Sequence, residues 1–485
     1  MALRRRTFFI ENLGCPKNAV EGEGMADKLV RAGYAAVAEA SKADVVVVNT
    51  CSFIRPAQEE SIDRIFHHLG ERRSGQKVIA AGCLAERYGD ALRTDVPELD
   101  GILSTRRWHE IDQLVSEVER GARPCWQGAG DEPSAVGEGL DPTFTRDAEG
   151  RATAYVKIAE GCNMTCTFCA IPGFKGAQRS KPPEDIVREV TELVATGIQE
   201  VILVSQNTTA YGQDFAKEPS LSGTSLARLL ERICDRVPGL PWLRFHYCYP
   251  GWVNDDLLQT MARLPQVVKY LDIPLQHAHP QILKAMRRPS DVQHVKDVLA
   301  RARALMPDLA IRTTFIAGFP GETAAHFQAV LDLMTEVRFD HVGVFPYHPE
   351  DGTPAAALGR QVSERVKQSR KSRALELQQE ISLARHQTLV GKDVDVLVEG
   401  EADGSLSHAG APLGTAQLVG RTHRDAPEVD GFVLFHGTAR KGQIVRVRIT
   451  GAGPYDLFGV QDLMKSRPDP AARVGLRQLP VLQPR

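Results

Sequence analysis

Three cysteines stand close together in the segment EGCNMTCTFCAIP, namely Cys162, Cys166 and Cys169. Cysteine thiolates bind zinc and iron–sulfur clusters, and both kinds of site are complete with four protein ligands. Structural zinc is usually held by two pairs of ligands, and no second Cys-x2-Cys or Cys-x2-His pair follows this triplet. The spacing Cys-x3-Cys-x2-Cys therefore favours a 4Fe–4S cluster whose fourth iron has no cysteine ligand.

An iron without a protein ligand can bind the amino and carboxylate groups of S-adenosylmethionine and pass it an electron, which yields a deoxyadenosyl radical. Such a radical can remove hydrogen from an unactivated carbon. The triplet, with Phe168 directly before its last cysteine and a predicted strand before its loop, resembles the motif of the radical S-adenosylmethionine superfamily. The resemblance implies that S-adenosylmethionine completes this site.

A second set of three cysteines lies in the amino-terminal part of the chain. Cys15, Cys51 and Cys83 come just after the apolar segments RTFFIEN, ADVVVVNT and KVIAAG, at separations of 36 and 32 residues. The carboxyl ends of parallel strands share one sheet edge, where ligands bind in open α/β folds. We therefore expect these thiols to meet there and hold a second 4Fe–4S cluster, with one iron open for a sulfur species or the acceptor.

The remaining cysteines, Cys125, Cys234 and Cys248, are expected to be incidental or packing residues. The total of nine is odd and no secretion signal is recognised, which argues against a disulfide scaffold. No apolar run reaches the 18 residues of a membrane span. The 61 acidic and 59 basic residues nearly cancel to a net charge of −2, and we expect a soluble, cytoplasmic protein.

The elements that must position these cysteines predict an α/β protein. Strands and helices alternate over residues 1–125, which predicts a parallel sheet covered on both faces. Residues 126–150, rich in Gly, Pro, Asp and Glu, predict a linker. Six strand–helix units over 151–385 predict a partial (βα)6 barrel with its chemistry at the strand carboxyl ends. Short strands and Gly-rich turns over 386–465 predict a small β-barrel, and 466–485 a flexible tail.

Several longer motifs extend the resemblance over nearly the whole chain. They are ENLGCPKNAV, NTCSFI, AAGCLAERY, EGCNMTCTFC, YLDIPLQHAHPQILKAMRR, RTTFIAGFPGET, GTPAA and GRTHRDAPEVDG. With them the chain resembles the methylthiotransferases, radical enzymes that insert sulfur at a C–H bond and methylate it. Within these it most resembles the RimO type, which modifies an aspartate β-carbon in ribosomal small-subunit protein twelve.

The resemblance implies a cofactor set and partners. Cys162, Cys166 and Cys169 would hold the cluster that cleaves S-adenosylmethionine, and the amino-terminal trio would hold an auxiliary 4Fe–4S cluster. The carboxy-terminal barrel would be TRAM-like. Small-subunit protein twelve would be the substrate, and an electron donor such as flavodoxin or ferredoxin would act with a sulfur donor that the sequence does not identify.

Four further residues are candidates for contact with S-adenosylmethionine. Phe168 could lie near the adenine, or could simply pack in a hydrophobic cluster. Gln206 and Asn207 follow the second predicted barrel strand, where they could bind the cofactor or form a turn. Arg312 could pair with a carboxylate of the cofactor or of the target aspartate.

Two other functions fit parts of the pattern. The MiaB-type tRNA methylthiotransferases share the six cysteines, but LGCPKN and DAPEVDG favour the RimO type. Residues 386–465 contain ten acidic and eight basic residues, whereas an RNA-binding barrel would carry a basic excess. A non-catalytic iron–sulfur carrier needs no open iron, so two sets of only three cysteines argue against it.

Some positions depart from the family pattern. They are the segment VEGEGM at Val20 to Met25, where Asp-Ser-Glu is common, Ala170 and Lys175, where a bulkier aliphatic residue and an arginine are usual, and His348, where serine is frequent. All six cysteines remain in place. These departures bear on the residues around the clusters and on the fit of the substrate.

Overall fold

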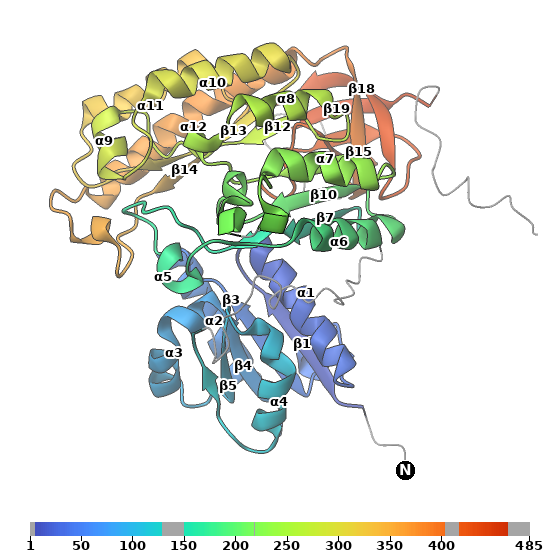
Figure 1. Ribbon diagram of the computed structural model, residues 1–485, viewed down its shortest axis with the longest axis vertical. Helices are drawn as coiled ribbons and strands as arrows, with labels where there is room; N and C mark the ends of the chain where they lie inside the picture. The colour runs from blue at the N-terminus through green and yellow to red at the C-terminus, as the bar shows by residue number, and fades with distance from the viewer. Residues whose placement is uncertain (1–4, 129–149, 218, 403–416, 464–485) are drawn as a thin grey trace, which may run out of the picture.

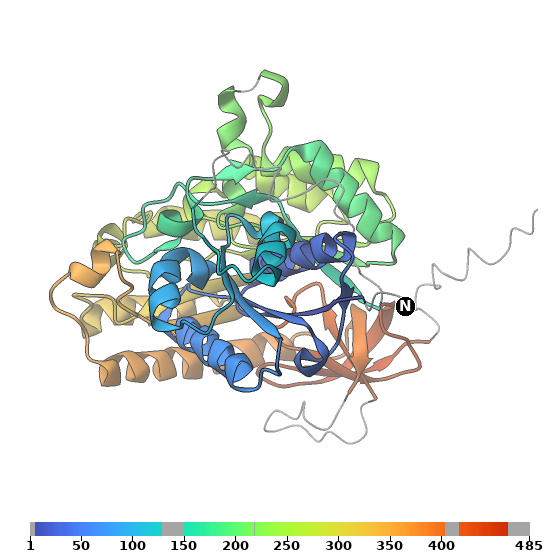
Figure 2. The ribbon, with the colours of Figure 1, turned by 90° about the horizontal axis from the view of Figure 1, so that it is seen from below.

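The computed structural model describes residues 5–128, 150–217, 219–402 and 417–463. Figures 1 and 2 show an amino-terminal α/β domain in blue, a larger barrel from green to orange, and a small β-barrel in red. Most of the predicted linker and all of the predicted tail lie outside the described residues.

The amino-terminal domain has a parallel sheet in the order β2-β1-β3-β4-β5-β6. Its strands are β1 (Thr7–Asn12), β2 (Ala35–Ala36), β3 (Val45–Thr50), β4 (Lys77–Gly82), β5 (Gly101–Ser104) and β6 (Cys125–Trp126), and its helices are α1 (Pro16–Arg31), α2 (Arg55–Gly70), α3 (Cys83–Asp95) and α4 (Ile111–Glu119). The side chains of Val45 and Val47 pack with α1 and α4, whereas Val46 and Val48 pack with α2 and α3. The sheet is therefore covered on both faces, as the continuous valine run predicts.

Strand β6 was not expected from the sequence, since Trp126 falls in the predicted linker. The strand is two residues long and pairs with β5 in parallel. It has no periodicity of its own, and its position is decided by the pairing and by the guanidinium of Arg107, which lies 4.7 Å from the centre of the Trp126 ring.

The middle part of the chain forms the predicted partial barrel of six parallel strands. They are β7 (Thr153–Lys157), β10 (Glu200–Val204), β11 (Trp242–Phe245), β12 (Tyr270–Asp272), β13 (Ala310–Ala317) and β14 (His341–Pro346). The two three-stranded sheets, β7-β10-β11 and β12-β13-β14, are joined by a parallel bridge between Leu243 and Val267. Alternate residues of each strand face a continuous outer core that includes Cys234 and Cys248, so both cysteines pack as expected.

Helices cover the outside of this barrel. The longer ones are α6 (Pro183–Ala195), α7 (Leu226–Arg236), α8 (Asp255–Arg263), α10 (Val292–Leu305), α11 (Ala324–Val337) and α12 (Glu364–Gln387). Shorter elements are α5 (Ile171–Lys175), α9 (Pro280–Ala285), β8 (Ala159–Glu160) and β9 (Arg179–Ser180). Helix α5 and the amino end of α1 lie where the barrel meets the amino-terminal domain (Figure 1).

The carboxy-terminal part is a closed five-stranded barrel in the order β15-β16-β17-β19-β18, which confirms the predicted small β-barrel. Its strands are β15 (Asp393–Glu401), β16 (Leu418–Thr422), β17 (Val433–His436), β18 (Ile444–Ala452) and β19 (Leu457–Gln461). The interior is filled by Val396, Val398, Phe435, Val447 and neighbouring apolar side chains.

A buried ion-pair group joins the small barrel to the amino ends of strands β7 and β10. The guanidinium groups of Arg421 and Arg244 each lie 2.7 Å from a different carboxylate oxygen of Glu200, and all three side chains are fully buried. Arg421 also donates to the hydroxyl of Thr153 at 3.1 Å. Burial alone would raise the pKa of Glu200, but Arg244 and Arg421 lower it to about 2, so the carboxylate stays charged.

We expect the substitution Arg421→Ala to lower the free energy of unfolding by about 3 kcal/mol, because one oxygen of the buried Glu200 carboxylate loses its charged partner and keeps only the hydroxyl of Thr153 among the described residues. Chemical denaturation measures this change. The control is Arg448→Ala on the same small barrel, where the exposed guanidinium pairs with Asp393 and a much smaller loss is expected because solvent screens the pair. Equal losses in the two variants would contradict the structural role of Arg421.

Candidate cluster sites and their surroundings

The three amino-terminal cysteines come together at the carboxyl edge of β1, β3 and β4. The thiols of Cys15 and Cys83 both donate towards Oδ1 of Asn18, at 3.8 and 3.6 Å. The side-chain amide of Asn18 donates in turn to two backbone carbonyls, one just after β1 and one at the end of β3. Asn18 thereby ties together the loops that carry Cys15 and Cys51, and the predicted meeting of the three thiols is observed.

Gly14 allows Cys51 to lie close to the backbone of the loop that carries Cys15. Its φ is +86°, and a Cβ atom built on it would lie 2.7 Å from Sγ of Cys51. A side chain at this position would therefore both strain the backbone and displace the thiol. Glycine is required here by the approach of Cys51.

The loop after β7 and β8 carries the second trio. The amide of Met164 donates to Sγ of Cys162 at 3.5 Å, and the amide of Cys169 donates to the carbonyl of Cys166 at 3.1 Å. Nη1 of Arg288 lies 3.9 Å from Sγ of Cys166. These contacts turn the backbone at Cys162 and again between Cys166 and Cys169, on one loop that Arg288 approaches.

Phe168 is partly buried and packs against apolar side chains from three segments. These apolar side chains are Ile282, Met286, Phe319, Tyr347 and Ala355. The structure therefore shows the hydrophobic packing that was one of the two predicted roles of Phe168. Its contact with the adenine stays a prediction.

Both trios fit the iron–sulfur clusters predicted for them. Burial raises the pKa of Cys51, Cys83 and Cys162, and that of Cys169 to about 12, so their thiolates need nearby positive charge. Iron ions provide such charge. Within the described part of the chain, no three Cys, His, Asp or Glu groups converge as ligands of a single metal ion. Each thiolate of a cluster binds a different iron, so three thiols that do not converge on a single ion are compatible with a cluster.

A buried group of four charges lies between the amino-terminal domain and the barrel. Oε1 of Glu21, on α1, is 3.0 Å from Nζ of Lys157 and 2.8 Å from Nζ of Lys175. Glu160 completes the group at 2.5 Å from Lys157 and 3.2 Å from Lys175. Burial alone would raise the pKa of Glu160, but the two lysines lower it. Two of the departures from the family pattern, at Glu21 and Lys175, therefore meet in one interaction.

Gln206 and Asn207 lie close to this group, at the carboxyl end of β10. Nε2 of Gln206 donates to Glu160 at 2.8 Å, and Oδ1 of Asn207 accepts from Thr209 at 2.9 Å. Among the described residues, the other polar atoms of both side chains, Oε1 of Gln206 and Nδ2 of Asn207, are buried without a hydrogen-bond partner. Such atoms are uncommon in native structures and suit contact with a ligand.

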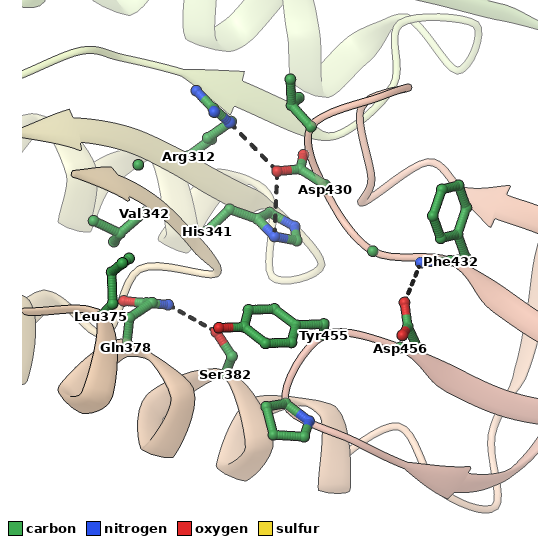
Figure 3. Close-up of a pocket in the computed structure, with 14 residues that line it drawn as sticks. Arg312, His341, Val342, Leu375, Gln378, Ser382, Asp430, Phe432, Tyr455 and Asp456 are labelled. Carbon is green, nitrogen blue, oxygen red and sulfur yellow. Dashed lines mark hydrogen bonds and ion pairs between the residues drawn. The ribbon is translucent and has the colours of Figure 1, made fainter. Parts of the chain in front are cut away.

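Arg312 lies on β13 in a cleft between the barrel, α12 and the small barrel (Figure 3). Its guanidinium is 3.3 Å from Oδ1 of Asp430 and 3.5 Å from Oδ1 of Asp272. His341 approaches the same oxygen of Asp430 at 3.5 Å (Figure 3). Both carboxylates that Arg312 contacts belong to the protein, and its predicted contact with the cofactor or substrate is untested.

Lys17 and Tyr247 also meet at this junction, and neither was expected from the sequence as a site residue. Nζ of Lys17 lies 3.9 Å from the centre of the ring of Tyr247, the second residue after β11. The signal for Lys17 was its place two residues after Cys15 in LGCPKN. No sequence pattern points to Tyr247, whose φ of +64° is uncommon for a residue with a side chain.

Three family models match successive parts of the chain. They are the uncharacterized protein family UPF0004 over residues 7–104, the radical SAM superfamily over 156–334 and the TRAM domain over 390–461. A solved structure of the radical S-adenosylmethionine methyltransferase TsrM from Kitasatospora setae aligns with a TM-score of 0.51 and 14% identity, over 73% of this chain and 74% of that one. At this identity the likeness shows the fold alone. No helix of the described residues is long and apolar enough to cross a membrane.

Curated relatives are much more similar in sequence. The ribosomal protein uS12 methylthiotransferase RimO of Herpetosiphon aurantiacus is 44% identical over 476 residues, covering 93% of this chain and 99% of its own. The protein of the same name from a Roseiflexus species is 44% identical over 468 residues, covering 93% and 96%. The protein is thus a radical S-adenosylmethionine enzyme of the methylthiotransferase class, with S-adenosylmethionine and 4Fe–4S clusters as cofactors. Within this class the chain belongs to the RimO family.

We expect Glu21→Gln to lower the free energy of unfolding by about 3 kcal/mol, because the buried Lys157 and Lys175 then share only the charge of Glu160. Denaturant unfolding measures the loss. Glu59→Gln is the control, since Glu59 forms an exposed pair with Arg55 at 3.0 Å on α2. A loss below about 1 kcal/mol for Glu21→Gln would show that the buried group does not hold the two domains together.

Proposed function

We propose that this protein replaces a hydrogen atom on the β-carbon of an aspartate in ribosomal protein uS12 with a methylthio group. The observation that carries the proposal is the presence of two cysteine trios on two domains that a buried charge group joins. Its support in sequence is the 44% identity over 93% of the chain to a protein named ribosomal protein uS12 methylthiotransferase.

The two trios take different roles in this proposal. Cys162, Cys166 and Cys169 hold the cluster that binds S-adenosylmethionine, and Cys15, Cys51 and Cys83 hold the auxiliary cluster on the facing domain. When bound, the cofactors supply electron transfer, hydrogen abstraction and sulfur. The protein holds these groups in place and excludes water from them.

Other side chains of the barrel complete the cofactor site. The unpartnered atoms of Gln206 and Asn207 bind S-adenosylmethionine, and Phe168 supports the loop on which its cluster sits. Arg312 does not contact the cofactor directly, since its guanidinium already pairs with Asp272 and Asp430.

The enzyme acts in the cytoplasm, where its ribosomal substrate is made, with an electron donor such as flavodoxin or ferredoxin and a separate sulfur donor. A tRNA substrate is less well supported. The small barrel has no basic excess, with ten acidic against eight basic residues over 386–465. A mildly acidic surface suits a basic ribosomal protein.

The proposal is tested by anaerobic reaction of reconstituted enzyme with S-adenosylmethionine, sulfide, dithionite and intact uS12, followed by mass spectrometry. The expected product carries SCH3 in place of H on one aspartate. Cys83→Ala is expected to abolish this product but to retain formation of deoxyadenosine, because the trio of Cys162, Cys166 and Cys169 is intact. Deoxyadenosine without modified uS12 in the wild type would contradict the proposed substrate, and bulk tRNA would be assayed next.

The role of the amino-terminal trio is tested separately by Gly14→Ala, whose Cβ would lie 2.7 Å from Sγ of Cys51. We expect the iron bound per chain to fall from about eight to about four, because the auxiliary cluster is lost. Gly33→Ala is a matched control, since Gly33 has a φ of +97° and nothing within 4 Å of the added atom. Full iron content in Gly14→Ala would argue against the assignment of this trio as ligands.

A further inference from the structure

Three lysines lie near the junction of the two domains: Lys157 and Lys175 are buried, and Lys17 is partly buried. Lys157 and Lys175 pair with Glu21 and Glu160, as described above. Among the described residues, Lys17 has no hydrogen bond or ion pair, and its recorded contact is the ring of Tyr247. An ammonium group has three donors and a ring face satisfies it only in part, so Lys17 can still bind an anion.

Lys17 lies between the two halves of the site. Its backbone follows Cys15 by two residues at the sheet edge where the amino-terminal trio meets. Its Nζ reaches to 3.9 Å from the ring of Tyr247, at the carboxyl end of barrel strand β11. The ammonium therefore stands where the edge of one domain meets the open end of the other.

Tyr247 is held firmly in this position. Its amide donates to Oδ2 of Asp272 at 2.9 Å, and its carbonyl accepts from the amide of Thr208 at 3.1 Å. These bonds fix a backbone whose φ is +64°. A strained residue held by bonds on both sides is typical of a functional site, and here it presents a ring that orients Lys17.

Three arginines of the barrel near this region each have a hydrogen-bond or ion-pair partner, although two nitrogens of Arg244 and one of Arg288 have none among the described residues. Arg244 pairs with the buried Glu200, and Arg312 with Asp272 and Asp430. Arg288 stacks on Tyr249 at 4.2 Å and donates to a backbone carbonyl. Of these four cationic side chains, Lys17 is the one that makes no hydrogen bond or ion pair among the described residues, so its charge is available to a carboxylate.

We propose that Lys17 binds the side-chain carboxylate of the target aspartate and thereby selects aspartate as the residue to be modified. The inference rests on the proposed function and adds its specificity-determining residue. In aspartate the reacting β-carbon is bonded directly to the carboxylate, so a cation that holds this group also fixes the carbon beside the amino-terminal trio. A neutral nucleobase gains nothing from this lysine.

The test compares binding of uS12 with binding of uS12 in which the target aspartate is changed to asparagine. The reconstituted enzyme with S-adenosylmethionine, but without reductant, is titrated anaerobically, so that no turnover occurs. We expect the wild type to bind the aspartate form roughly 10- to 100-fold more tightly, as for a charge-assisted hydrogen bond. In Lys17→Met this ratio falls to about one, through loss of affinity for the aspartate form alone.

Two further variants serve as controls. Lys17→Arg keeps the charge and is expected to retain most of the preference. Lys296→Met removes a lysine whose ammonium lies 2.8 Å from Glu336 on the outer helices, and it is expected to leave the ratio unchanged. Equal weakening of both forms of uS12 in Lys17→Met would indicate a structural role and overturn the inference.

The wild-type comparison decides the matter even where Lys17→Met fails to bind its clusters. Equal affinities of the wild type for the two forms of uS12 would overturn the inference by themselves. Failure of the wild type to methylthiolate uS12 would instead overturn the proposed function. Modification of uS12 with an unchanged ratio in Lys17→Met would leave that function standing and reject only the role of Lys17.

Discussion

The buried charge group of Glu21, Lys157, Glu160 and Lys175 fixes how the two cluster-bearing domains sit on each other. Charges removed from water are tolerated only when opposite charges and hydrogen bonds replace the lost solvation. Each lysine here contacts both carboxylates, so a shift of one domain would leave charge buried without a partner. The relative position of the two cysteine trios depends on this constraint.

A second group of buried ion pairs lies at the opposite end of the barrel. Arg421 of the small barrel enters between the first residues of β7 and β10 and pairs with Glu200, which Arg244 contacts from the other side. The small barrel thus covers the amino ends of these strands, and the carboxyl ends remain for the loops that carry Cys162 and Gln206. This division of the two ends is the usual one in (βα) barrels.

The lysines at the junction differ in how many carboxylates surround each ammonium group. Lys157 and Lys175 stabilise the fold because two carboxylates surround them. Within the part of the chain that the structure describes, Lys17 contacts the ring of Tyr247 without a hydrogen bond or ion pair, and it keeps donors for another group. The same residue type therefore serves structure in one place and recognition in another, and the difference lies in the neighbours that the fold provides.

The sequence by itself determined which six cysteines are the candidate cluster ligands, the order of the three domains along the chain and the position of most strands. Ligand spacing, apolar runs and the position of each cysteine after a strand are local properties that one segment carries alone. Only the tertiary structure decided that Glu21 meets Lys175, that Arg312 faces Asp430 and that Lys17 rests on Tyr247. These pairs join residues 118 to 230 positions apart, and no local pattern encodes such contacts because they exist only after separate elements have packed.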